Sequence, residues 1–243
     1  MAQQLLIAHP GHELLLHGWI SRTKPTVHVL TDGSARLDMT AALLRDAGAR
    51  PGAIFGRLTD CEAYAMILEG NAALLLSLAE ELAAVLERER PAMIVVDAAE
   101  GYNPVHDLCR VVGGAAIAIA GVDVALYEYA VVGHPQAFDA AVTIDLDDAE
   151  YTAKIESARR YGAALADVDE LLSRHGADAY RREAFRRVGD WTAFDGAAPP
   201  LYERYGETRV AAGRYSRVIR RDEHMRPLCD ALRAAVEKRS CAF

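Results

Sequence analysis

The amino-acid sequence predicts an α/β protein with a Rossmann-like, mostly parallel sheet flanked by helices and with a mainly helical C-terminal extension. Short apolar or β-branched runs alternate with longer stretches of helical periodicity through the first part of the chain. Strands that alternate with helices in this way form parallel sheets with right-handed crossovers. The chain has 243 residues, and 51% of them are hydrophobic, which is enough to bury the core of a large domain.

The N-terminal segment contains two expected strands, each followed by a helix. Gln4–Ala8 ends in an apolar run and is the first strand, and the mostly apolar Leu14–Ile20 is a buried helix. Lys24-Pro25 ends this helix, because proline cannot continue it. Thr26–Thr31 is apolar and β-branched, which predicts the second strand. Arg36–Ala47 places its leucines at helical spacing and is the next expected helix.

The middle of the chain continues this alternation. Ala53–Phe55 is expected to be a short third strand, and Asn71–Glu89 a long helix with a leucine and alanine face. Met93–Asp97 (MIVVD) is the clearest buried strand, and Val105–Ala120 is the helix that follows its polar loop. Two more strands are expected: Val124–Tyr129 and Ala141–Leu146.

The character of the sequence changes at residue 147, which predicts a boundary between an α/β domain, 1–146, and a mainly helical extension, 147–243, that packs on it. Asp147–His175 is one long helical stretch with acidic residues at its cap and first turn. The arginine-rich Ala177–Arg187 continues the helical pattern. The remaining segments are a loop, Trp191–Pro200, a mixed region, Tyr202–Arg221, and a terminal helix, Glu223–Lys238.

Charge and composition argue against several classes of partner. The net charge of −8 and the pI of 5.5 provide no basic surface for nucleic acid or an anionic membrane. No apolar run reaches the roughly 18 residues needed to span a bilayer, and the N-terminus lacks the features of a signal peptide. The four cysteines are widely spaced and predict neither a zinc ribbon nor a disulfide framework. We therefore expect a cytoplasmic protein with a small-molecule substrate; a homo-oligomer is left open.

Three histidines follow two of the expected strands. His9 and His12 come directly after the first strand, and His106 closes the polar loop after Met93–Asp97. Because the carboxyl ends of parallel strands meet at one sheet edge, these histidines are expected to converge. When three protein ligands hold a zinc ion, its fourth position stays open for water, which is the arrangement of a catalytic site. The ion then lowers the pKa of that water towards ~7. Iron, cobalt or nickel would also suit such ligands.

These residues resemble the signature of a known family. Ala8-His9-Pro10-Gly11-His12-Glu13 is similar to the AHPDDE motif of the PIG-L/LmbE-like N-acetylglucosaminyl deacetylases, and Asn103-Pro104-Val105-His106 resembles their second metal motif. The resemblance extends to Thr31-Asp32-Gly33, Arg36-Leu37-Asp38 and Thr59-Asp60. It covers roughly residues 4–175 of the chain.

The resemblance implies a role for each matched position. His9, His12 and His106 would be the zinc ligands, with histidine in place of the aspartate at position 12. Arg36 and Asp60 would contact sugar hydroxyls, although a surface salt bridge for Arg36 and a helix cap for Asp60 are equally compatible with the sequence. Asn103 would take the position of the oxyanion-stabilising histidine. Beyond the matched motifs, the neighbouring Tyr102 is a second candidate for this contact and an expected substrate contact.

Two positions depart from the family pattern. The general base of AHPDDE is replaced by Gly11, which cannot transfer a proton, and the first histidine of the second motif is replaced by Asn103, whose amide can still donate to an oxyanion. A carboxylate elsewhere would have to replace the base, and the candidates are Asp97, Glu13, Glu100, Asp32 and the C-terminal Asp222-Glu223-His224. Asp97 is the best placed of these, although it could equally orient a liganding histidine.

The resulting hypothesis is a zinc-dependent hydrolase that deacylates an N-acyl amino sugar or a similar small amide through metal-bound hydroxide. The loss of the usual base at Gly11 leaves two alternatives open. One is a metal-dependent hydrolase or lyase that acts on a non-sugar biosynthetic intermediate. The other is a non-catalytic pseudoenzyme that binds a small molecule.

Overall fold

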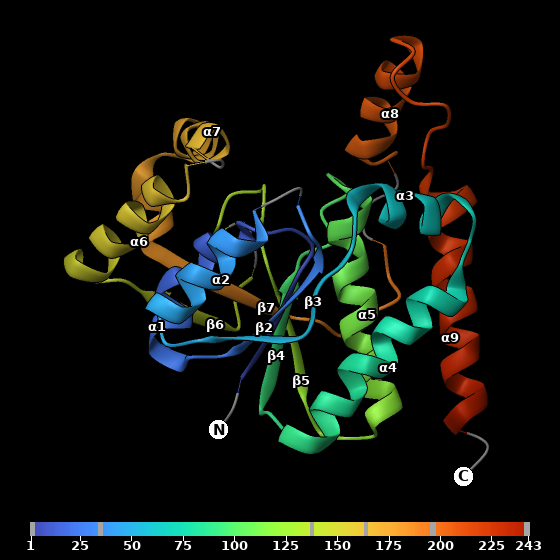
Figure 1. Cartoon of the computed structure of the whole chain (residues 1–243), viewed down its shortest axis with the longest axis horizontal. Coiled ribbons are helices and arrows are strands. Elements are labelled where there is room, and N and C mark those ends of the chain that lie inside the picture. Colours follow the sequence, from blue (N-terminus) through green and yellow to red (C-terminus); the bar gives the residue numbers. More distant parts are fainter. Residues whose placement is uncertain (1–2, 34–35, 137–138, 163–164, 195–197, 241–243) are drawn as a thin grey trace.

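The computed structural model describes residues 3–33, 36–136, 139–162, 165–194 and 198–240. Within these residues, helices flank a seven-stranded, mostly parallel sheet, which confirms the predicted fold class (Figure 1). The strand order is β3-β2-β1-β4-β5-β7-β6. Strands β3, β2, β1, β4 and β5 pair in parallel, whereas β7 pairs antiparallel with both β5 and β6.

Most of the strands lie where the sequence predicts them. Their bounds are β1 Gln4–Ile7, β2 Thr26–Thr31, β3 Arg50–Leu58, β4 Met93–Asp97, β5 Ala125–Tyr129, β6 Val142–Asp145 and β7 Arg182–Arg187. Strand β3 is much longer than the predicted Ala53–Phe55. The prediction was too short because Pro51 and two glycines interrupt the apolar pattern of the strand. An edge strand tolerates such residues, and the register of β3 against β2 shifts twice along their length.

Most of the helices also follow the predicted order, but the helix Asp60–Leu68 was not predicted, and the stretch Asp147–His175, predicted as one helix, contains two, Asp148–Arg160 and Leu165–His175. The predicted helix Leu14–Ile20 begins as a 3-10 helix, η1 His12–Leu16, and continues as α1 His17–Thr23. The other α-helices are α2 Leu37–Asp46, α3 Asp60–Leu68, α4 Ala72–Glu89, α5 Pro104–Ala120, α6 Asp148–Arg160, α7 Leu165–His175, α8 Leu201–Ala211 and α9 Arg226–Ser240. A π-helical turn, η4 Arg221–Met225, leads into α9.

The sheet buries an apolar layer on each face. Helices α4 and α5 cover one face, with α9 packed against them, and α1, α2 and α6 lie on the other side (Figure 1). Successive residues of β1 point to opposite faces, so Leu6 joins the core beneath α4 and α5 while Leu5 and Ile7 join the core beneath α1 and α2. All three are fully buried. Burial on both faces explains why β1 is apolar from Leu5 to Ile7.

The predicted helix over Ala177–Arg187 is wrong beyond residue 181. Ala177–Arg181 is a 3-10 helix, η3, and Arg182–Arg187 forms β7. Two side chains of β7 pack against distant elements: Glu183 accepts a hydrogen bond from Lys154 over 2.9 Å, and Phe185 packs with its ring centroid 5.6 Å from that of Trp19. These long-range contacts override the local helical pattern. Because β7 joins the sheet from beyond residue 147, the division into 1–146 and 147–243 stays a prediction.

Some predicted features fall in segments that are not described. Residues 163–164 of the stretch Asp147–His175 and residues 195–197 of the loop Trp191–Pro200 lie outside the described residues, as does Cys241. Cys61, Cys109 and Cys229 are free thiols. In the described segments, no helix combines the length and apolar character required to cross a membrane.

Candidate metal centre

The carboxyl end of β1 delivers two histidines to one edge of the sheet. The Ala8 amide donates to Asp97 Oδ2 over 2.8 Å, which ties the turn after β1 to the end of β4. Gly11 adopts a φ of 108°, a left-handed value that favours glycine, and the chain then enters η1. This turn brings the ring centroids of His9 and His12 to within 5.4 Å of each other.

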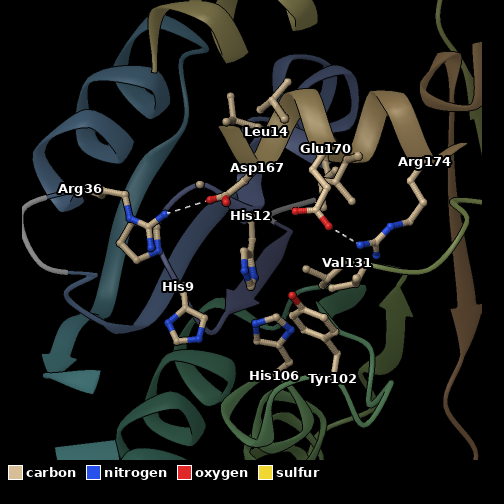
Figure 2. Close-up of a pocket in the computed structure, with 16 residues that line it drawn as sticks. His9, His12, Leu14, Arg36, Tyr102, His106, Val131, Asp167, Glu170 and Arg174 are labelled. Carbon is tan, nitrogen blue, oxygen red and sulfur yellow. Dashed lines mark hydrogen bonds and ion pairs between the residues drawn. The ribbon is translucent and has the colours of Figure 1, made fainter. Parts of the chain in front are cut away.

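The third histidine comes from the first turn of α5. Asn103 caps this helix, and its side-chain oxygen accepts a hydrogen bond from the Val105 amide over 2.9 Å. The cap fixes the start of the helix and therefore the position of His106. The His106 ring centroid lies 5.2 Å from that of His9 and 4.5 Å from that of His12. The structure thus brings the three predicted ligands together (Figure 2).

The spacing of the rings suits a shared ion. Three imidazoles bound to one tetrahedral ion at ~2.1 Å have centroids roughly 5 Å apart. The observed separations of 4.5, 5.2 and 5.4 Å lie around this value. As the side chains stand, no group of three His, Cys, Asp or Glu residues in the described segments is placed to hold a metal ion. Binding an ion would therefore require the imidazoles to rotate, although their separation already suits it.

Two of the rings are oriented through their Nδ1 atoms. His9 Nδ1 lies 2.8 Å from Thr31 Oγ1 and 3.2 Å from Asp60 Oδ1. His12 Nδ1 lies 2.7 Å from Asp97 Oδ2. Hydroxyl and carboxylate partners on one nitrogen are typical of histidines that bind a metal through the other. Both rings therefore have the outer contacts expected of ligands.

His106 has a buried ring nitrogen that is available to a bound partner. Its ring is 4% exposed, and its Nδ1 atom has no hydrogen-bond partner among the described residues. An unsatisfied buried polar atom costs about 1–3 kcal/mol, so this nitrogen favours a bound partner. Burial lowers the pKa of His106 well below its usual value and also lowers the pKa of His9. Neutral imidazole is the form that binds metals, and these residues therefore fit a divalent ion.

Asp97 lies behind the cluster. It is fully buried, and besides His12 and Ala8 its partners include Tyr129, whose hydroxyl donates to Oδ1 over 2.8 Å. A fully buried carboxylate does not reach a substrate. Of the two roles that the sequence leaves open for Asp97, this position favours the orientation of His12 over proton transfer.

The Asp97→Asn variant tests this role. We expect the apparent affinity for divalent metal to fall by about 10–100-fold, the usual effect of removing the outer partner of a liganding histidine. Competition with a chromophoric chelator measures this affinity. Asp123→Asn, a change at an exposed residue after α5, serves as the matched control. Equal affinities in the two variants would show that Asp97 does not orient a ligand.

Glu13 is also a structural residue of the turn. Its side chain is fully buried, and it accepts hydrogen bonds from the Gly11 amide over 2.7 Å and from Thr40 Oγ1 over 2.7 Å. The Thr40 hydroxyl in turn lies 2.5 Å from the Tyr161 hydroxyl. Burial raises the pKa of Glu13. These contacts hold the histidine turn against α2 and α6, and they leave Glu13 poorly placed for the catalytic role predicted for it.

Asn103 and Tyr102 lie at the open side of the cluster. The side-chain nitrogen of Asn103 is 3.4 Å from His9 Nε2, so its amide can donate to a group bound beside His9. The Tyr102 ring is 45% exposed, and its centroid lies 6.2 Å from that of His106. The predicted positions for oxyanion and substrate contacts are thus next to the histidines.

Arg36 and Asp60 differ in their relation to the site. The Arg36 side chain reaches the cavity in front of the histidines and pairs with Asp167 of α7 over 3.7 Å. Asp60 begins α3 and its carboxylate contacts His9, whose imidazole lowers the Asp60 pKa. The Asp60 side chain is still 38% exposed. Its predicted contact with a sugar hydroxyl is therefore compatible with its contact with His9.

A cavity of about 230 Å³ opens in front of the histidines. One of its walls is α7, which the sequence does not predict as part of the site. Asp167 and Glu170 lie three residues apart on α7, on the same face, and line this cavity together with the histidines (Figure 2). No local signal links this helix to the histidine turn, because the contact spans most of the chain. The only indication was indirect: with Gly11 in the turn, a hydrolase needs a carboxylate from elsewhere.

Two further groups that the sequence suggests as the general base have structural contacts away from the histidines. Glu100 accepts hydrogen bonds from the backbone amides of Val131, Val132 and Gly133 over 2.9, 3.0 and 2.7 Å, and burial raises its pKa. The segment Asp222-Glu223-His224 forms the π-helical turn before α9, where His224 Nδ1 accepts from the Arg220 amide over 3.0 Å. We therefore do not assign the proton-transfer role to these groups.

Comparison with known proteins relates the fold to solved structures. Neither a protein-family model nor a curated protein sequence matches the chain. A conserved protein from Thermus thermophilus aligns with a TM-score of 0.58 and 17% identity, over 77% of this chain and 94% of its own. An antimicrobial pseudoaglycone deacetylase aligns with a TM-score of 0.53 and 15% identity, over 73% of this chain and 88% of its own.

A third similar structure is the zinc-inhibited form of a teicoplanin deacetylase. It aligns with a TM-score of 0.51 and 14% identity, over 78% of this chain and the whole of its own. These likenesses show that the chain has a fold that is also found in deacetylases of antibiotic biosynthesis.

Proposed function

We propose that the protein is a metal-dependent amide hydrolase that deacylates an N-acyl amino sugar or a similar small amide. The observation that carries this proposal is the convergence of His9, His12 and His106 on one cavity at the carboxyl edge of the sheet. The fold shared with deacetylases and the AHPGHE motif support the same reaction class. We also propose that the chain is a member of the PIG-L/LmbE-like family.

The three histidines would hold the ion, and zinc is our first choice among the divalent metals. When bound, the ion would supply Lewis-acid activation of water and of the amide carbonyl. A similar structure is described as a zinc-inhibited form, so iron, cobalt and nickel belong in the same test. Asp97 and Thr31 would keep two of the imidazoles oriented through their Nδ1 atoms.

The substrate would be held by residues around the cavity mouth. The Asn103 amide would donate to the developing oxyanion, a contact that stabilises the transition state. Arg36, Asp60 and Tyr102 would contact the sugar hydroxyls. The apolar side chains of Leu14, Val131 and Leu171 line the same cavity and would exclude bulk water from the reacting amide.

Glu170 is our candidate for proton transfer. Asp167 is paired across the cavity with Arg36, whereas Glu170 pairs with Arg174 of its own helix. An exposed pair within one helix contributes only about 0.3–0.5 kcal/mol, so little is lost when Glu170 leaves it. Glu170 can therefore take a proton from water and deliver it to the leaving amine.

The direct test measures bound metal and amine release together. Freshly purified protein is expected to contain about one equivalent of divalent metal and to release amine from N-acetylglucosamine or its methyl glycoside. A chelator should abolish this activity, and re-addition of a single metal should restore it. Protein that neither retains any of the four metals nor releases amine after their addition would contradict the proposal.

Gly11 favours one second candidate function. A glycine at the base position leaves room for a substrate group beside the histidines, and its added Cβ atom would be 3.6 Å from the Tyr161 ring. Such an opening would suit a hydrolase or lyase that acts on a non-sugar biosynthetic intermediate. Turnover of non-sugar amides or esters without turnover of amino sugars would favour this candidate. Metal-free protein that binds a ligand without turnover would indicate a pseudoenzyme.

A further inference from the structure

A second and larger cavity adjoins the histidine site. Its volume is about 670 Å³, within the range of roughly 300–1,000 Å³ that is typical of small-molecule sites. Helix α3, the start of α5, α8 and the segment after α8 form its walls. Figure 1 shows α8 projecting beyond the body of the molecule, above α3. We name this cavity the tyrosine cleft after its principal lining residues, which are Tyr64, Tyr102, Tyr205, Tyr215, Arg214 and Arg217.

The tyrosine cleft borders the cavity of the proposed active site. Tyr102 lines both cavities. The side-chain nitrogen of Asn103 lies 3.4 Å from His9 Nε2 and donates over 3.5 Å to the hydroxyl of Tyr64, which lines the cleft. One side-chain amide therefore spans the distance between the two sites. A substrate whose amide lies at the histidines can extend past Tyr102 into the cleft.

The cleft offers aromatic faces that are already ordered. The side chains of Tyr205 and Tyr215 are 57% and 42% exposed, an unusual exposure for rings of this size. The Arg209 guanidinium carbon lies 5.6 Å from the Tyr205 ring centroid and 5.5 Å from that of Tyr215, so one cation contacts both rings. Rings that are fixed in this way lose little entropy when a ligand stacks on them.

The charged side chains that line the cleft favour a ligand with a negative charge. Arg214 and Arg217 line the cleft and are exposed, and no carboxylate is present among its described lining residues. Burial raises the pKa of Tyr64 to about 12, so this phenol remains a neutral hydrogen-bonding group. In a chain with a net charge of −8, such a cationic and aromatic surface stands out. Ring faces beside guanidinium groups suit an aromatic ring with an acidic substituent.

We propose that the tyrosine cleft binds the non-reacting part of the substrate, an aromatic group that carries a carboxylate and is joined to the amino sugar whose amide meets the histidines. This inference rests on the proposed deacylase function and narrows its substrate class to acidic aryl glycosides. Binding energy from the aryl group would then position the amide in the smaller cavity.

The test compares three N-acetylglucosamine probes: the methyl, phenyl and 4-carboxyphenyl glycosides. Calorimetry on the metal-loaded Glu170→Gln protein, in which turnover of the probes is expected to be slow, should give about tenfold tighter binding of the phenyl than of the methyl glycoside, with a further gain for the carboxyphenyl probe. Tyr205→Ala and Tyr215→Ala should reduce the phenyl-to-methyl affinity ratio towards one. Arg214→Ala and Arg217→Ala should remove only the carboxylate gain. Arg204→Ala, an exposed change on α8, should keep the wild-type ratios.

The outcomes separate this inference from the proposed function. Aryl preference in binding without amine release from any probe would overturn the deacylase function and support the cleft. Amine release with equal affinities and equal kcat/KM for the three probes would overturn the cleft alone. A dimer in light scattering that Tyr205→Ala converts to monomer, together with no aryl preference, would also overturn it, because a second copy would then occupy the cleft.

Discussion

The His106→Ala variant is expected to lose its metal and its activity together. His106 closes the ligand set, and its unpartnered Nδ1 makes it the residue with the most to gain from a bound ion. Loss of an outer partner alone reduces affinity by about 10–100-fold, so loss of a ligand should exceed this range. We expect kcat/KM to fall below about 1% of the wild-type value, because Lewis-acid activation is lost with the ion. Metal content by mass spectrometry and amine release measure the two effects.

Two further variants distinguish the loss of a metal ligand from the loss of the folded structure. His106→Gln retains most of the side-chain volume in this buried position, and its thermal melting should stay close to that of the wild type. His134→Ala changes an exposed histidine that contacts His175 outside the cluster, and it should keep its metal and its activity. A folded His106→Gln protein with full metal content and full turnover would refute the three-histidine site.

The three histidines could be predicted because the contact between their loops follows from sheet topology. β1 and β4 are neighbouring parallel strands, with Leu6 paired to Val96, so the loops after them begin side by side. Each strand is recognisable from its own apolar run. Given the two strands, adjacency of the turn at His9 and the loop before His106 needs no further information.

The parts that could not be predicted depend on contacts between distant segments. Strand β7 is short and arginine-rich, and its pairing with β5 and β6, the packing of Phe185 and the contact of Glu183 with Lys154 stabilise it as a strand. The position of α7 over the cavity has the same origin. The roles of Asp97 and Glu13 also depend on burial. Both are candidate catalytic carboxylates by their positions in the sequence, yet neither has an exposed atom in the folded chain.

The structure gives a physical reason for the missing base at position 11. The Tyr161 ring packs against Gly11 and its hydroxyl contacts Thr40, which in turn holds Glu13. An aspartate at this position would need a left-handed backbone, which residues other than glycine rarely adopt. Tyr161 ends α6, and α7 follows shortly after in the chain. The ring that packs against Gly11 thus belongs to the residue at the end of α6, close in the chain to the helix that brings other carboxylates to the cavity.

Glu170→Gln is expected to reduce kcat by about 10²–10⁴-fold, the usual contribution of a general base. KM and metal content should change little, because glutamine retains the size and polarity of the side chain and the histidines are untouched. This separates the variant from His106→Ala, which loses metal and turnover together. Asp169→Asn, on the same helix but outside the described cavity wall, is the matched control and should retain wild-type kcat.

The Asp167→Asn variant shows which of the two carboxylates on α7 is the general base. Asp167→Asn breaks the contact with Arg36 and should mainly raise KM, because Arg36 is a proposed substrate contact and not a proton carrier. A large fall in kcat for Asp167→Asn with a normal kcat for Glu170→Gln would transfer the base to Asp167. Either result keeps the carboxylate on α7, since the carboxylates of the histidine turn and of β4 are buried behind the ligands. Normal kcat in both variants would refute proton transfer from this helix.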